Sequence, residues 1–171
     1  MSAEGLNYKK IKMRLKEIEL TYKNHFVGME YYFLILNRTF LILKSSGFLI
    51  GIQGNGSVSV EGGRDILTRQ ITSSLAIKGD LNNPYSYIKN KYIEKIDNTD
   101  LLDGSLTKLN QTNFVIKLTD ITDVKYNANK KFGMGPYPHD GTVTINTFDN
   151  KKREFIILGN QSGQEIANWI L

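Results

Sequence analysis

Cysteine is absent from the sequence, which excludes disulfides, thiolate metal sites and cysteine nucleophiles. No run of about 18 apolar residues occurs, so no segment is expected to span a membrane. The first twenty residues, MSAEGLNYKKIKMRLKEIEL, are charged throughout and lack the apolar stretch of a signal peptide. Together these absences predict a protein of a reducing compartment, and we expect a cytoplasmic location.

The chain has no alternation of strands and helices of the kind that builds a nucleotide-binding α/β fold. Its 171 residues, 40% apolar and 23% charged, fit one soluble domain with one core. We predict a single domain over residues 1–171. It would comprise an N-terminal amphipathic helix at 1–24 and a main body at 25–171, with an insertion at about 54–112.

Positive charge is concentrated at the N-terminus. The net charge is +5, and residues 1–24 carry six Lys or Arg against three Asp or Glu. The basic residues from Lys9 to Lys16 could contact nucleic acid, anionic lipid or an acidic partner, or could simply form a solvated helix face.

Apolar residues recur every three or four positions over 4–23, which predicts the N-terminal helix. The stripe consists of Tyr8, Ile11, Leu15, Ile18 and Tyr22. Such a stripe must be buried, either on the same chain or against a second copy, and the sequence leaves both possibilities open.

Seven or so antiparallel strands are indicated by β-rich segments separated by turn residues. The first two would form a hairpin that turns at Asn37–Arg38. The last two would be joined by Asp149 to Lys152. The candidate segments are 29–36, 39–44, 48–53, 113–118, 121–127, 142–148 and 153–159, a short strand between the glycines at 54–56 and 62–63, and 66–79, which would hold one strand or two.

Helical periodicity returns in three places. One helix is predicted from Pro84 to Ile96 and a short one around Leu101 to Leu109. Near the C-terminus, Ser162 and Glu165 have the spacing of a capping box. The helix that follows would place Trp169 over the open corner of the twisted sheet.

Three segments resemble bacterial pleckstrin-homology-like (PH/GRAM-type) domains. YYFLILNRTFLILK resembles their opening hairpin, NFVIKLTDITDVKY their middle segment, and REFIILGNQSGQEIANWIL their last strand and closing helix. The resemblance covers roughly residues 29–53 and 113–171. It implies a mainly β (α+β) fold: an antiparallel sandwich or partly open barrel closed by a C-terminal helix.

The resemblance also implies a binding scaffold for lipid head groups, peptides or protein surfaces, and not an enzyme. Lipid-binding members carry several Lys or Arg across the first strand pair and its loop. Here the expected turn is Asn37–Arg38 and the strands contribute only Lys44, so head-group recognition in the usual place is not expected.

Candidate catalytic residues are few. His139 and Asp140 could suggest a metal or an acid/base pair, but a metal needs three or four ligands, and the other histidine, His25, is remote in sequence. The glycines of 51–63 lack the Lys-Ser/Thr of a phosphate loop. We predict no catalytic residues, no metal and no cofactor. The tyrosines at 31, 32, 85, 87 and 92 could stack on bases but are expected in the core or at its rim, so a nucleic-acid partner is not expected.

The segment KKFGMGPYPHDGT at 130–142 admits two interpretations. Its prolines and glycines favour a stiff hairpin loop. Alternatively, four residues at the loop mouth would contact an anionic ligand or partner: Lys125, Lys130, Lys131 and His139.

Three functions are therefore compared. The favoured one is a non-catalytic PH-like binding module for a protein partner or for self-association. The alternative is peripheral binding to an anionic membrane or ligand through Lys9–Lys16 and the 125–139 loop. The third, a small hydrolase, lacks a recognisable ligand set.

Overall fold

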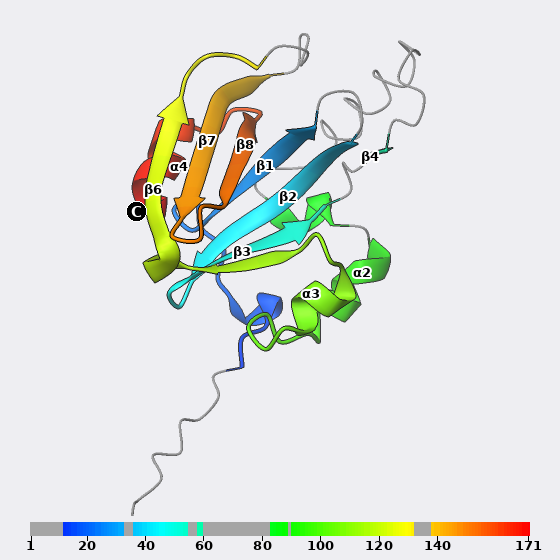
Figure 1. Cartoon of the computed structure of the whole chain (residues 1–171). Helices are drawn as coiled ribbons and strands as arrows, with labels where there is room; N and C mark the ends of the chain where they lie inside the picture. The colour runs from blue at the N-terminus through cyan, green and yellow to red at the C-terminus, as the bar shows by residue number, and fades with distance from the viewer. Residues whose placement is uncertain (1–11, 33–35, 55–57, 60–82, 89, 132–137) are drawn as a thin grey trace, which may run out of the picture.

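The computed structural model describes residues 12–32, 36–54, 58–59, 83–88, 90–131 and 138–171. Seven antiparallel strands form one sheet in the order β5-β3-β2-β1-β8-β7-β6. The sheet curls into a half-barrel, with α4 beside β6 and β7 (Figure 1). This is the mainly β architecture predicted from the sequence.

The elements have the following bounds. The strands are β1 (His25–Tyr32), β2 (Leu36–Ser45), β3 (Phe48–Gln53), β5 (Phe114–Lys117), β6 (Ile121–Asn127), β7 (His139–Thr147) and β8 (Lys152–Leu158), and the two-residue β4 (Val58–Ser59) pairs with β2. The α-helices are α2 (Asn90–Asp97), α3 (Ser105–Leu109) and α4 (Gly163–Ile170), and the 3-10 turns are η1 (Leu15–Glu17), η2 (Pro84–Tyr87) and η3 (Leu118–Asp120).

The first hairpin exists, but the predicted turn at Asn37–Arg38 is wrong. These residues lie within β2, where Arg38 is opposite Glu30 and Asn37 is opposite Tyr31. The connection falls at 33–35, outside the described residues. The core explains this register: Phe26 of β1 and Phe40 of β2 both lie in it, so even-numbered residues face inward on both strands. A turn at 37–38 would pair even with odd residues and move one strand's apolar side chains to the opposite face.

Four phenylalanines form the centre of the core inside the curled sheet. The Phe155 ring lies 6.0 Å, centroid to centroid, from each of the rings of Phe26, Phe40 and Phe114. One half of the sheet, β5-β3-β2, contributes Phe40 and Phe114 to this cluster, and the other half, β1-β8-β7-β6, contributes Phe26 and Phe155. The two halves of the sheet therefore meet at this cluster.

The predicted C-terminal helix is present as α4, which packs against β6 and β7 and buries its apolar face in the core. Its cap is also confirmed, since the Ser162 hydroxyl accepts a hydrogen bond from the Glu165 amide at 3.3 Å. Trp169 is half-buried and its ring packs edge-on against Phe26 at 5.8 Å, while Ile166 and Ile170 are buried. Burial of this face is what stabilises so short a helix.

A second apolar cluster lies on the outer face of β2 and β3. Leu41, Leu43, Ile50 and Ile52 are fully buried there, although they alternate with residues that face the inner core. They are covered by apolar side chains of the helical insertion, namely Ile88, Ile96, Leu101 and Leu106. The strands β2 and β3 are therefore buried on both faces, which accounts for their nearly continuous apolar sequence.

The predicted N-terminal helix is wrong for residues 12–24, and residues 1–11 lie outside the described residues. This segment is mainly extended, with a single 3-10 turn at η1. Its backbone is held by the insertion, since Met13 O accepts from Leu101 N at 2.8 Å. Met13 and Leu15 are both buried in the outer cluster, a spacing of two that suits an extended chain. The segment thus packs on its own chain, and these tertiary contacts override the helical periodicity.

The helical part of the insertion agrees with the sequence. The predicted helix from Pro84 to Ile96 appears as η2 followed by α2, and the short helix near Leu101–Leu109 appears as α3. The predicted strand at 66–79 lies outside the described residues. Across the part of the chain that the structure describes, no helix is long and apolar enough to cross a membrane.

Candidate functional site

The four residues predicted at the loop mouth have different surroundings. Lys125 is exposed on β6, and its ammonium lies 3.1 Å from the Asp123 carboxylate on the same strand. Lys130 is exposed before the undescribed segment 132–137. Lys131 forms an ion pair of 2.6 Å with Glu154 on β8. His139 is buried, and its Nε2 accepts from the Lys131 amide at 3.1 Å.

Of the four residues, only Lys131 and His139 are therefore shown in contact, by a hydrogen bond from the backbone amide of Lys131 to the His139 ring. Lys125 instead pairs with a carboxylate on its own strand. His139 and Asp140 lie in β7 and not in a turn, because β7 begins at His139. The buried His139 and the backbone of Lys131 are thus joined by a hydrogen bond on the two sides of the undescribed segment 132–137.

Asp140 connects β6, β7 and α4. One of its oxygens accepts from the Tyr126 hydroxyl at 2.8 Å, and the other accepts from the amide of Gly163, the first residue of α4, also at 2.8 Å. The hydrogen bond to the carboxylate raises the pKa of Tyr126, because it favours the protonated phenol. Asp140 is thus occupied in attaching the closing helix.

Two other residues that the sequence singled out are also held by hydrogen bonds. The Nδ1 of His25 lies 2.6 Å from the carbonyl of Thr21, in the turn before β1. The ammonium of Lys44 donates to the carbonyl of Trp169 at the end of α4. Neither side chain contributes to the groove described next.

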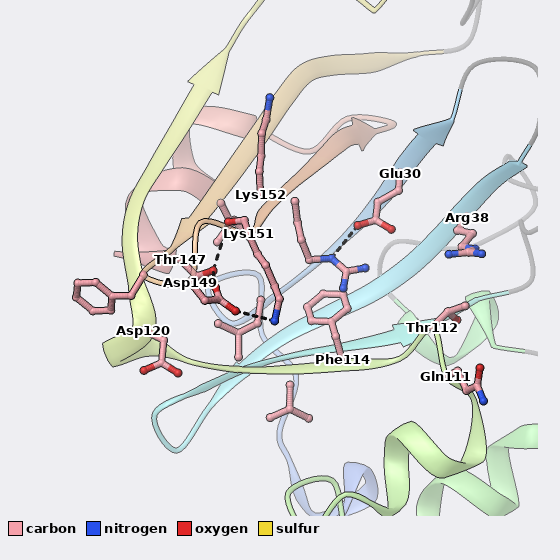
Figure 2. Close-up of a pocket in the computed structure, with 15 residues that line it drawn as sticks. Glu30, Arg38, Gln111, Thr112, Phe114, Asp120, Thr147, Asp149, Lys151 and Lys152 are labelled. Atoms are coloured by element: carbon pink, nitrogen blue, oxygen red, sulfur yellow. Dashed lines mark hydrogen bonds and ion pairs between the residues drawn. The ribbon is translucent and has the colours of Figure 1, made fainter.

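The groove that we take as the candidate site lies between β5 and the β7–β8 hairpin and encloses about 700 Å³. Figure 2 shows β5 with Phe114 along one wall, and Asp149, Lys151 and Lys152 of the hairpin along the other. Glu30, near the end of β1, and Arg38, near the start of β2, lie opposite each other and also line the groove. The groove is thus the place where the two halves of the curled sheet separate.

Arg153 is one of the residues that line this groove. Its Nε donates to the Glu30 carboxylate at 2.7 Å, and its guanidinium carbon lies 3.8 Å from the centroid of the Phe114 ring. The Arg153 side chain is 25% exposed and that of Glu30 only 7%. The guanidinium therefore combines an ion pair at its edge with a cation–π contact on its face.

The hairpin charges form exposed pairs at the rim. Lys151 contacts Asp149 at 2.6 Å, and Lys152 contacts Glu154 at 3.5 Å. Hydrogen bonds from Lys151 and Thr147 lower the pKa of Asp149 to about 2, and the same carboxylate raises the pKa of Lys151. Pairs exposed to this degree are screened by water and exchange readily with other charged groups.

Sequence reasoning missed the group formed by Glu30, Phe114 and Arg153. These residues lie on three strands and are 84 and 39 positions apart, so no local pattern connects them. The inward alternation of β5 and β8 could have predicted that Phe114 and Phe155 are buried. The stacking of Arg153 on Phe114 depends on how the sheet curls.

The groove is suited to recognition by charge and shape. Among the described residues, no group of three or more His, Asp or Glu side chains is placed to hold a metal ion. The groove offers instead a fixed guanidinium, rim lysines, an aromatic ring and one edge of the sheet.

Comparison with known proteins gave no match: no family model, no curated protein and no solved structure matches this chain.

Proposed function

We propose that this chain is a non-catalytic binding module of PH-like type, which holds an extended segment of a partner protein in the groove between β5 and the β7–β8 hairpin. The observation that carries this proposal is the open edge of β5. The strand is the last in the sheet order, and residues Phe114, Val115 and Ile116 line the groove.

The hydrogen-bond pattern identifies which backbone groups of β5 face the open edge. The amide of Leu118 donates to the carbonyl of Gly47, so residue 118 faces β3. Because the direction alternates along an antiparallel strand, Phe114 and Ile116 also face β3, and the backbone groups of Val115 and Lys117 face away from it. An added strand could pair with these donors and acceptors, as in other cases of β-augmentation.

The opposite wall of the groove offers apolar contact. Phe148, at the tip of the hairpin, is 71% exposed and also lines the groove. An exposed aromatic beside an open strand edge would pack on side chains of the added segment, and such residues are enriched in protein interfaces.

A curled antiparallel sheet with a C-terminal helix is consistent with a PH-like fold. Fold alone does not determine function, so the proposal depends on the groove. The alternative is binding to an anionic membrane through Lys9–Lys16 and the 125–139 loop, and it is the competing outcome of the experiment below.

The substitution Lys117→Pro tests the open edge directly. Lys117 is exposed and has φ −67°, the angle that proline requires, and its amide faces away from β3. Proline should therefore be accepted by the fold while it removes one donor from the free edge. The matched control is Lys117→Ala, which removes the same charge and keeps the amide.

The probe is a displayed library of random heptapeptides selected on the full chain. We expect enriched peptides that bind Lys117→Ala within about threefold of the native affinity and Lys117→Pro at least about tenfold more weakly, the ratio for one lost backbone hydrogen bond. Failure to enrich any peptide, or equal binding to both variants, would contradict the proposal. Salt-sensitive binding to phosphatidylserine vesicles without peptide binding would favour the membrane alternative.

A further inference from the structure

The groove contains a guanidinium with unused hydrogen-bond donors. Arginine has five N–H donors in a planar fork, and here Nε donates to Glu30 at 2.7 Å. Across the described residues, neither terminal amino group of Arg153 donates a hydrogen bond to a protein atom. Since the side chain is one-quarter exposed and lines the groove, these donors are available to a bound acceptor.

Arg153 is held in one orientation before any ligand arrives. The buried Glu30 fixes the Nε edge of the guanidinium, and the Phe114 ring supports its face, with its centroid 3.8 Å from the guanidinium carbon. The rings of Phe40 and Phe155 lie within 5.7 Å of the same carbon. A fork restrained in this way loses little conformational entropy when it binds an oxyanion.

The charges near Arg153 favour an anion over a cation. The groove is lined by four basic residues, Arg38, Lys151, Lys152 and Arg153, and by three acidic residues, Glu30, Asp120 and Asp149. Asp149 is engaged by Lys151, and Glu30 is engaged by Arg153. The lining residues thus carry one more positive than negative charge, and an incoming carboxylate would also meet a preoriented guanidinium.

We propose that Arg153 is the receptor for a carboxylate group, which the two terminal amino groups of its guanidinium hold in a bidentate pair. This inference rests on the proposed function, because it assigns the carboxylate to an Asp, a Glu or the C-terminus of the extended segment that pairs with β5. A planar carboxylate matches the planar fork of arginine, and the paired N–H···O bonds fix its orientation.

Two substitutions, one at Glu30 and one at Arg153, should change carboxylate binding in opposite directions. In Glu30→Gln the amide oxygen can still accept from Nε, but the negative charge that competes for the guanidinium is gone. Carboxylate binding should then strengthen, by about threefold or more at low salt. In Arg153→Lys the positive charge remains without the fork, and binding should weaken by about tenfold.

The binding site can be probed without any peptide. Sodium acetate supplies the carboxylate alone, and the NMR signal of the Arg153 Nε–H reports on the guanidinium directly. We expect a saturable shift of this signal with acetate in the native chain, a stronger response in Glu30→Gln, and none with sodium chloride at equal ionic strength. In Arg153→Lys, the acetate-induced shifts of the amides at Phe114 and Glu30 should disappear.

Several outcomes would overturn the assignment. If the Arg153 Nε–H signal of the native chain does not respond to acetate, Arg153 is not a carboxylate receptor, even if peptides bind along β5. Inorganic phosphate that binds more tightly than acetate would assign the site to a phosphate-bearing ligand. If Arg153→Lys does not fold, as judged by circular dichroism, the direction of the change in Glu30→Gln decides. An acetate response without any enriched peptide would support Arg153 as a carboxylate receptor and would contradict the proposed binding of an extended segment along β5.

Discussion

The ammonium group of Lys44, on β2, lies 2.5 Å from the carbonyl oxygen of Trp169 and 3.3 Å from that of Ile170, at the C-terminal end of α4. The carbonyls of a helix's last turn lack partners within the helix and carry its partial negative charge. The Lys44 ammonium donates hydrogen bonds to these carbonyls and places a positive charge beside them, although Lys44 and Trp169 are 125 positions apart in the sequence. The cation that could have suggested head-group binding is instead a cap for the closing helix.

Replacing Lys44 by methionine should destabilise the protein by about 1–2 kcal/mol, since the helix end loses a charged donor while the apolar stem is kept. Urea unfolding at neutral pH measures the difference. Lys125→Met is the matched control, because Lys125 is 73% exposed and lies next to Asp123 on its own strand. Equal effects of the two substitutions would mean that Lys44 contributes nothing as a cap.

Gly141 should tolerate no side chain. It has φ +61°, and a Cβ atom there would lie 1.9 Å from the backbone oxygen of Asn127. Gly47 has φ +84° but no atom within 4 Å of the same position. Gly47→Ala should therefore cost about 1 kcal/mol for its backbone angle alone, and Gly141→Ala at least about twice as much. Thermal unfolding of both variants distinguishes the cost of the backbone angle from the cost of the steric clash with Asn127. Similar melting temperatures would show that β6 and β7 move apart easily.

The ion pair of Lys131 and Glu154 should make stability depend on pH. The hydrogen bond from Lys131 holds the pKa of Glu154 below its ordinary value. A lowered pKa contributes stability above the ordinary glutamate pKa of about 4.3, and this contribution is lost as the pH falls through the folded value. Both side chains are about one-third exposed, so the contribution is at most about 1 kcal/mol.

Lys131→Met should therefore be less stable than the native chain above about pH 5, and the difference should shrink below about pH 4. Urea unfolding at several pH values measures this dependence, and the Glu154 side-chain carbon signal reports its pKa in each protein. A difference in unfolding free energy that is the same at pH 3 and pH 7 would show that the pair does not act through its charges.

The sequence predicted those elements whose cause is local. Ser162 caps α4 because its hydroxyl reaches an amide three residues later, a distance fixed by helix geometry. The hairpin of β7 and β8 was likewise found from a turn-rich segment between two alternating strands, and Asn150 has the positive φ that such turns use.

The errors came from contacts between distant residues. Residues 12–24 have helical periodicity, but Leu101 and Asp100 bind the backbone of Met13 and hold the segment extended. His139 looked like part of a polar loop and is buried in β7. The groove could not be predicted because Arg153 reaches Glu30 and Phe114 across three strands whose order is set by the whole sheet.

The burial of β2 and β3 on both faces limits how this protein could be divided. An insertion in a surface loop can usually be removed or exchanged without loss of the scaffold. Here the residues after β3 supply one side of an apolar layer, and the N-terminal segment supplies another part of it. The sheet and its closing helix are therefore not a self-sufficient module to which the insertion was added. Evolutionary shortening of the chain to that minimal unit would have to replace Leu41, Leu43, Ile50 and Ile52 at the same time.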